Sequence, residues 1–154
     1  MLFAQPPASA KPLDIKAMRA KVKPDMTPDA LVKALGAPVL KSPVSAAKDQ
    51  EYWRFEALDG VLLATVATHA HALPAPKVLH VAAYYQLAVL RARAKVGMTL
   101  KELKTTLGDI SPITPYHDPH TDDNYSIEAS NGWLNFHLDA ASGKIARFTS
   151  IARK

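Results

Sequence analysis

Apolar and polar positions follow one pattern twice in this chain, 72 residues apart. Residues 24–36 and 96–108 share Met, Thr, two Leu and Gly at the same five places. The leucines stand four residues apart, which is the spacing of one helix face. Thr27 and Thr99 are suited to cap the first turns, and Glu102 completes a capping box in the second copy. A helix is therefore predicted between Thr and Gly in each copy.

Flanking segments also match between the copies. A shorter helical pattern precedes each capped helix, over Ile15–Val22, where Asp14 is the expected cap, and over Leu87–Lys95. Polar stretches containing proline follow, at Ala37–Gln50 and Asp109–Asp123, and are predicted to be loops.

Alternating segments come next in both copies and predict strands. Asp59-Gly60 and Asn131-Gly132 are dipeptides typical of tight hairpin turns. Trp53, Phe55 and Leu62 are expected to face the core in the first copy. Each copy is thus expected to be an α-α-β-β-β unit. In copy one the predicted strands are Glu51–Leu58, a strand after Gly60 and Lys77–Tyr84. In copy two they are Asn124–Ser130, a strand after Gly132 and Lys144–Ile151.

Direct comparison of the copies supports a duplication. Residues 15–66 align with 87–138 without a gap, and 13 of the 52 positions are identical. Unrelated segments would match at about one position in fifteen. We therefore predict an α+β protein with a flexible leader or signal-peptide remnant over 1–12, a first repeat over 13–85 and a second repeat over 86–154. In each repeat the helices would pack on one face of an antiparallel sheet.

Composition narrows the classes of function. The 154 residues are 48% hydrophobic and 21% charged, which is typical of a globular protein, and no apolar run approaches the roughly 20 residues of a membrane span. The net charge is +5, but no four Lys or Arg are consecutive, so the charge favours solubility over nucleic-acid binding. The absence of cysteine excludes disulfides, thiolate metal sites and cysteine nucleophiles.

The first residues suggest export. Met1-Leu2-Phe3-Ala4 resembles the end of an apolar signal region, and Ala8-Ser9-Ala10 is a small-residue cleavage pattern. A truncated signal peptide and a plain flexible leader are the two interpretations. The first predicts a periplasmic or secreted protein.

The repeated motifs resemble a known family. Gly97–Gly108, the aromatic strand residue Tyr125, Asn131–Asp139 and Gly143–Ile145 are similar to the SmpA/OmlA (BamE-like) domain of bacterial envelope proteins. The first copy departs from the pattern at Asp25 and in a longer last turn. A tandem pair is also similar in architecture to secreted β-lactamase inhibitor proteins. That resemblance implies two sheets that together form a concave, protein-binding surface.

The sheet face opposite the helices is the predicted binding surface. Aromatic, Arg and aliphatic side chains in an exposed patch are typical of a protein interface. The alternatives are that a loop or a dimer partner covers this face, or that one strand has the opposite register. The predicted binding residues are Tyr52, Arg54, Leu63, His80, Trp133, Asn135, His137 and Arg147, and the same face is expected to display Glu56, Val61, Thr65, Asn124, Ser126, Glu128 and Ile145.

Two histidine-containing segments raise the question of a metal. His117, His120 and Asp122, in the 116–124 segment, are candidate ligands for a divalent cation. A solvated turn or a partner-contacting loop has the same composition, and the spacing matches no defined metal motif. His69 and His71 could also form a ligand pair, although a polar hairpin tip explains them as well.

No pattern in the sequence indicates catalysis. It contains neither a Gly-x-Ser-x-Gly elbow nor a phosphate-binding glycine loop. Glu56 and Glu128 occupy equivalent positions, but surface glutamates explain them without glycoside chemistry. The sequence therefore favours a non-enzymatic envelope or secreted protein, monomeric or homodimeric and without a cofactor, that binds another protein as an inhibitor or immunity factor. The alternatives are an outer-membrane assembly or scaffolding component and a metal-binding protein using the 116–124 loop.

Overall fold

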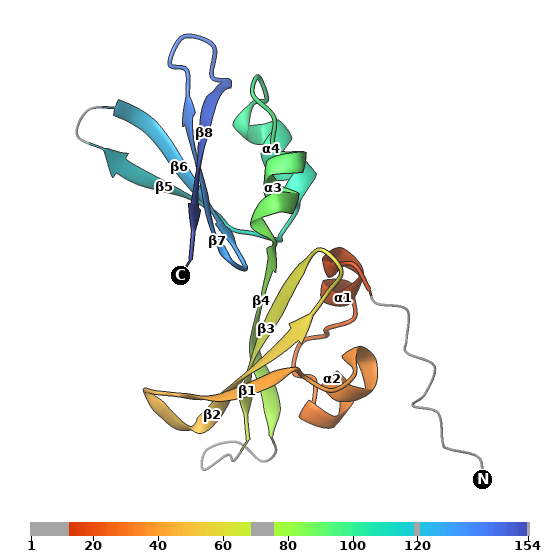
Figure 1. Ribbon diagram of the computed structural model, residues 1–154. Coiled ribbons are helices and arrows are strands. Elements are labelled where there is room, and N and C mark those ends of the chain that lie inside the picture. The colour runs from red at the N-terminus through yellow and green to blue at the C-terminus, as the bar shows by residue number, and fades with distance from the viewer. Residues whose placement is uncertain (1–12, 69–75, 119–120, 154) are drawn as a thin grey trace. The chain divides into compact units, whose positions relative to one another are not determined.

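The protein has a mixed α+β fold (Figure 1). The computed structural model describes residues 13–68, 76–118 and 121–153, without the side chains of residues 117, 118, 121 and 122. Contacts divide the chain into two compact units. The first unit runs to Leu58 and continues with Leu62–Val81, and the second contains Asp59–Val61 and the chain from Ala82 onward. Two helices followed by a four-stranded antiparallel sheet occur in that order in each half of the described chain.

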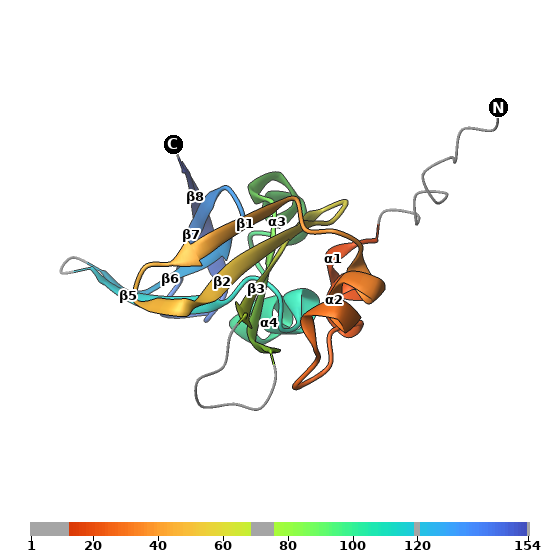
Figure 2. The same cartoon turned by 90° about the horizontal axis from the view of Figure 1, so that it is seen from below.

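The first half begins with two helices that lie on one side of its sheet (Figures 1 and 2). Apolar residues on the helices and on the facing side of the sheet form the core, where Ile15, Leu31, Phe55, Leu62 and Ala64 are at most 2% exposed. The sheet order is β1-β2-β3-β4. The elements are α1 (Ile15–Ala20), α2 (Pro28–Leu35), β1 (Leu40–Val44), β2 (Ala47–Glu56), β3 (Gly60–Ala67) and β4 (Lys77–Tyr85).

The second half repeats this arrangement with the sheet order β5-β6-β7-β8. Its core contains Leu90, Leu103 and Leu107 from the helices, and Tyr125 stacks on Phe136 with ring centroids 5.3 Å apart. The elements are α3 (Leu87–Arg93), α4 (Leu100–Leu107), β5 (Ile113–Asp118), β6 (Thr121–Ala129), β7 (Gly132–Leu138) and β8 (Ile145–Ala152).

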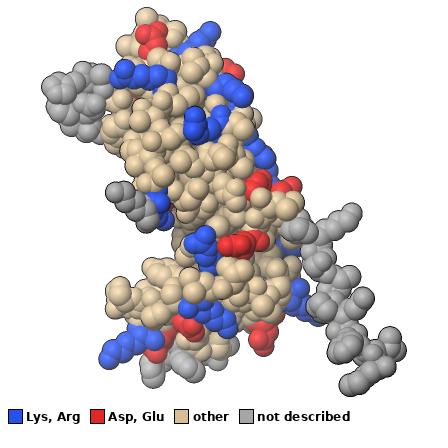
Figure 3. Space-filling view, in the orientation of Figure 1, with Lys and Arg blue, Asp and Glu red and all other residues tan. Residues whose placement is uncertain are grey.

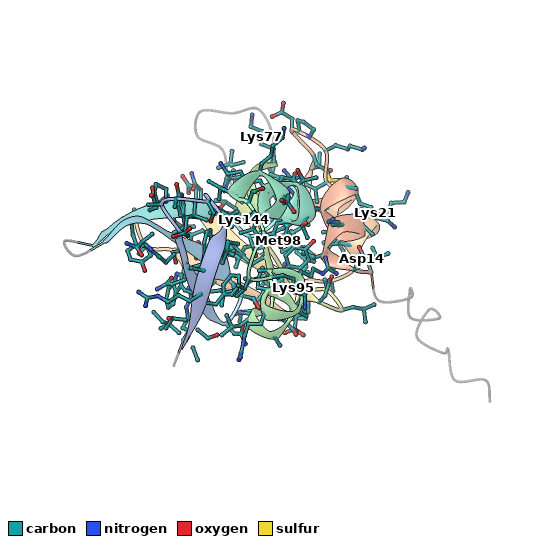
Figure 4. All side chains as sticks on the ribbon, turned by 90° about the horizontal axis from the view of Figure 1, so that it is seen from above. Asp14, Lys21, Lys77, Lys95, Met98 and Lys144 are labelled. Atoms are coloured by element: carbon teal, nitrogen blue, oxygen red, sulfur yellow. The ribbon has the colours of Figure 1, made fainter. Side chains whose placement is uncertain are left out.

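The predicted helix caps are confirmed. The Asp14 carboxylate accepts a hydrogen bond from the Ala17 N–H at 2.7 Å, and Asp14 and Lys21 mark the two ends of α1 in Figure 4. Thr27 caps α2 through the Ala30 N–H at 3.1 Å. In α4 the Thr99 and Glu102 side chains each bond the other's backbone, which is a complete capping box. These signals are local, so the sequence contains all that they require.

Equivalent backbone contacts recur at the predicted repeat positions. The Val78 N–H donates to the Met26 carbonyl at 2.8 Å, and the Ile145 N–H donates to the Met98 carbonyl at the same distance. Asp25 and Gly97 both have positive φ, 58° and 91°. The departure from glycine at Asp25 therefore keeps the same left-handed turn, since Asp is one of the few side chains that tolerate it.

The predicted three-strand units are wrong in their strand number. The stretches Ala37–Gln50 and Asp109–Asp123, predicted to be loops, contain β1 and β5 and the first residues of β2 and β6. Among the strands that the structure describes, β1 pairs only with β2 and β5 only with β6, so both are edge strands. An edge strand tolerates proline and needs no apolar alternation, and for this reason its sequence reads as a loop.

The second hairpin turns one residue earlier than predicted. Ala129 pairs with Gly132, so Ser130 and Asn131 form the turn and Gly132 begins β7. A Cβ at Gly132 would come within 2.2 Å of the Ile151 carbonyl oxygen. Glycine is required here by close approach of the neighbouring strand.

A β-bulge interrupts the pairing of the last two strands. His137 pairs with Arg147, but Leu138 pairs with Ile145, which leaves Ala146 without a partner on β7. The extra residue changes the alternation, so that Ile145 is buried and Arg147 is exposed. β4 shows the same sequence of burial, with Val78 buried and the next two residues exposed.

Candidate partner-binding surface

The outer face of the second sheet carries three rows of side chains across its strands. Residues paired directly across antiparallel strands point to the same face. We call this set the outer face: its rows are Tyr116, Asn124, His137 and Arg147; Thr114, Ser126, Asn135 and Thr149; and Glu128, Trp133 and Ile151. The structure thus brings the predicted residues Trp133, Asn135, His137 and Arg147 together on one surface of the second unit.

A polar hollow of about 190 Å³ opens on the outer face. His137 Nδ1 lies 3.3 Å from the Asn124 Oδ1, which fixes the imidazole at the wall of the hollow. The Oδ1 of Asn135 is buried and has no hydrogen-bond partner within the described part of the chain. The polar side chains that line the hollow are Tyr116, Asn124, Asn135, His137, Arg147 and Thr149.

Trp133 belongs to a charged cluster beside the hollow. The Arg153 guanidinium stacks over the Trp133 ring, 4.7 Å from its centroid. The same guanidinium lies 3.7 Å from a carboxylate oxygen of Glu128. Trp133 is half-buried, so its ring is an aromatic surface held by a cation and not a freely projecting side chain.

Tyr84 adds a neutral hydroxyl to the electrostatics of this cluster. Burial raises the pKa of Tyr84 above its usual value, the Glu128 carboxylate raises it further, and the Arg153 guanidinium partly opposes both. Because both dominant effects disfavour the phenolate, Tyr84 remains a hydrogen-bond donor at neutral pH.

The first sheet carries the other four predicted residues. Tyr52 and His80 are exposed, whereas Arg54 and Leu63 are half-buried. In the β1–β2 pairing Ser42 lies opposite Tyr52 and Leu40 opposite Arg54, so these pairs share a face. All four residues retain access to solvent, and their role in binding stays a prediction.

Three residues expected on the displayed faces are buried instead. Ile145 is 1% exposed because the bulge at Ala146 turns it toward the core. Val61 is 5% exposed and packs within the second unit. Asn124 keeps its predicted place on the outer face but is only 5% exposed, because Tyr116 and His137 flank it on the adjoining strands.

Sequence reasoning missed Tyr116, Thr149 and Arg153 as members of this surface. Tyr116 was hidden because β5 was expected to be a loop. Thr149 could have been found, since it stands two residues after Arg147 on a strand that was predicted. Arg153 follows the last strand, and no sequence signal relates it to Trp133.

The metal hypothesis stays a prediction. Among the described side chains, no group of three His, Asp or Glu residues could hold a metal ion. The candidates His117 and Asp122 have side chains outside that description, and His120 lies outside the described residues. His69 and His71 lie outside them too.

Charge on the visible surface is mixed. In Figure 3 the Lys and Arg side chains occupy separate positions, with Asp and Glu among them. None of the described helices has both the length and the apolar character that crossing a bilayer requires.

Comparison with known proteins does not assign the chain to a family. No protein-family model matches the sequence, and no curated protein matches it either.

Proposed function

We propose that the chain is a non-enzymatic recognition protein that binds another protein through its exposed sheet faces, and chiefly through the outer face of the second sheet. The observation that carries the proposal is the cluster of Trp133, Arg153 and Glu128 next to a polar hollow. Protein interfaces concentrate their binding energy in Trp, Tyr and Arg side chains with polar groups around them.

The finer parts of the proposal rest on the sequence motifs. The repeats are of the SmpA/OmlA (BamE-like) type, and the protein acts in the bacterial envelope or outside the cell as an inhibitor or immunity factor. The concave joint surface implied by the resemblance stays a prediction.

Affinity capture of partners tests the proposal. The full chain is immobilised, an envelope extract of the source organism is passed over it, and the captured proteins are quantified by mass spectrometry. A partner that is retained by wild type and lost with Trp133→Ala is then purified. We expect Trp133→Ala to raise its Kd by at least about 30-fold, equivalent to roughly 2 kcal/mol, because the substitution removes a central aromatic anchor.

Val96→Ala is the matched control, since Val96 is an apolar residue 64% exposed between α3 and α4. It should leave capture unchanged. Circular dichroism of each variant shows whether the fold is retained. Equal capture of every protein by wild type and a folded Trp133→Ala variant would refute binding through the outer face.

A further inference from the structure

The hollow on the outer face has the size of a subsite for one small group. Its 190 Å³ is well above the roughly 10–15 Å³ that a single water needs on the same measure. It is lined by residues of all four strands of the second sheet, so its shape is set by the sheet and not by a loop. Such a site admits one residue of a partner chain.

Arg147 gives the hollow its charge. The guanidinium is exposed, and no ion pair or hydrogen bond of Arg147 is found among the described residues. The described side chains that line the hollow include no carboxylate. Tyr116 and Thr149 also line the hollow, and their hydroxyls can donate. The hollow therefore favours a monoanion, and a planar carboxylate matches the paired N–H groups of a guanidinium.

Asn135 adds a second requirement. Its Oδ1 is an acceptor without a partner in the described structure and is closed to solvent, so a ligand N–H can reach it only when the Asn135 amide turns toward the hollow that the residue lines. Asn135 pairs with Thr149, and Arg147 stands two residues before Thr149 on β8. Asn135 and Arg147 are therefore diagonal neighbours, with Cβ atoms about 7–8 Å apart or less. A ligand that satisfies both presents a carboxylate and an N–H within one residue.

We propose that this hollow binds the C-terminal carboxylate of a polypeptide chain. The carboxylate pairs with Arg147. The Asn135 amide turns about χ2 into the hollow, and its Oδ1 accepts the N–H of the last peptide bond. A chain end carries both groups on one Cα atom and is small enough for the volume. Backbone nests capture chain ends in other proteins, and here side chains supply the corresponding groups.

This inference rests on the proposed function, because it describes the group that the partner presents to the outer face. The two can fail separately. If Trp133→Ala abolishes partner binding while the hollow binds no chain end, recognition through the face stands and the chain-end subsite is refuted.

N-acetylglycine is the probe for the subsite, since it carries the carboxylate and the last peptide N–H of a chain end without a side chain. The full-length protein, labelled with ¹⁵N, is titrated at constant ionic strength and followed by amide chemical shifts. We expect saturable shifts centred on Asn135, His137 and Thr149. N-acetylglycinamide, without the charge, should bind at least tenfold more weakly, and acetate, without the N–H, should also bind more weakly.

Three variants separate the subsite from general anion binding. Arg147→Gln should raise the Kd for N-acetylglycine at least tenfold. Asn135→Asp should abolish binding because the new carboxylate would repel the carboxylate of the ligand. Arg91→Gln, at an exposed arginine on α3 of the same unit, removes the same charge and should leave the Kd unchanged. The amide spectrum of each variant confirms its fold.

Three outcomes would overturn the inference. The first is the absence of saturable shifts with N-acetylglycine. The second is equal affinity for acetate, phosphate and N-acetylglycine, which would show a site for anions in general. The third is an equal loss of affinity in Arg91→Gln and Arg147→Gln, which would make net charge the cause.

Discussion

Two glycines stand where a neighbouring strand leaves no room for a side chain. A Cβ at Gly132 would meet the Ile151 carbonyl oxygen at 2.2 Å, and one at Gly60 would meet the Tyr84 carbonyl oxygen at 2.0 Å. The dipeptides Asp59-Gly60 and Asn131-Gly132 predict hairpins at both positions, with turn geometry as the reason for glycine. Both glycines are required because the backbone of the adjacent strand lies too close for a side chain. A local sequence pattern contains no information about that distance. The same limit explains Ile145, whose burial follows from a bulge at its neighbour Ala146.

Gly132→Ala is expected to destabilise the protein by about 1–3 kcal/mol, since the new Cβ strains a backbone at φ 156° and displaces β8. Urea unfolding followed by fluorescence measures the change in the free energy of unfolding. Gly143→Ala is the control, because Gly143 also has positive φ, 68°, but a Cβ there meets no atom within 4 Å. A loss in Gly143→Ala as large as that in Gly132→Ala would show that backbone conformation alone is the cause.

Elements differ in how far their own sequence specifies them. The helices were predictable to within two residues at their ends because caps, apolar spacing and stop signals are all local. Central strands were predictable because one face is buried. The edge strands β1 and β5 were missed because Pro43 and Pro115 suggested loops, and pairing on one side only removes the usual constraints.

Thr99→Ala is expected to lower stability by about 1 kcal/mol, because the first turn of α4 loses its cap and Glu102 loses its reciprocal partner. Thr27→Ala removes an N-cap of the same kind from α2, which has no Glu in the equivalent place, and should cost less. Amide hydrogen exchange resolves the two helices separately. Faster exchange should appear in α4 for Thr99→Ala and in α2 for Thr27→Ala, and an unchanged α4 in the former would contradict the structural role of the box.

At the scale of the whole molecule, the boundary between the two compact units differs from the boundary between the two sequence repeats. The repeat predicts a boundary after residue 85, whereas the second compact unit includes Ala82–Tyr85. Tyr85 is fully buried, its N–H donates to the Ser111 Oγ at 2.8 Å, and its carbonyl accepts from the Ser130 N–H at 2.9 Å. The repeated sequence locates the start of each copy, whereas the packing of side chains shows which residues belong to each compact unit.

A fragment of residues 82–154 is therefore expected to be more stable than a fragment of residues 86–154. The shorter one loses the buried Tyr85 ring and the two hydrogen bonds to its backbone. It keeps Arg93 but loses the stacking of that guanidinium on Tyr85, where it lies 4.6 Å from the ring centroid. Thermal unfolding by circular dichroism should give a Tm lower by several degrees for the shorter fragment, or no cooperative transition. Equal Tm values would mean that Tyr85 does not belong to the second unit.

The bulge at Ala146 determines which single-codon deletions β8 can tolerate. The unpaired residue is what allows one strand to place Ile145 in the core and Arg147 on the surface within three codons. In-frame loss of the Ala146 codon would make Ile145 and Arg147 neighbours on a regular strand, where consecutive side chains point to opposite faces, so Ile145 would stay in the core and Arg147 on the surface. A screen of single-codon deletions should therefore find that position 146 tolerates loss, whereas loss of the paired Phe148 codon should be poorly tolerated because the residues after it would change faces.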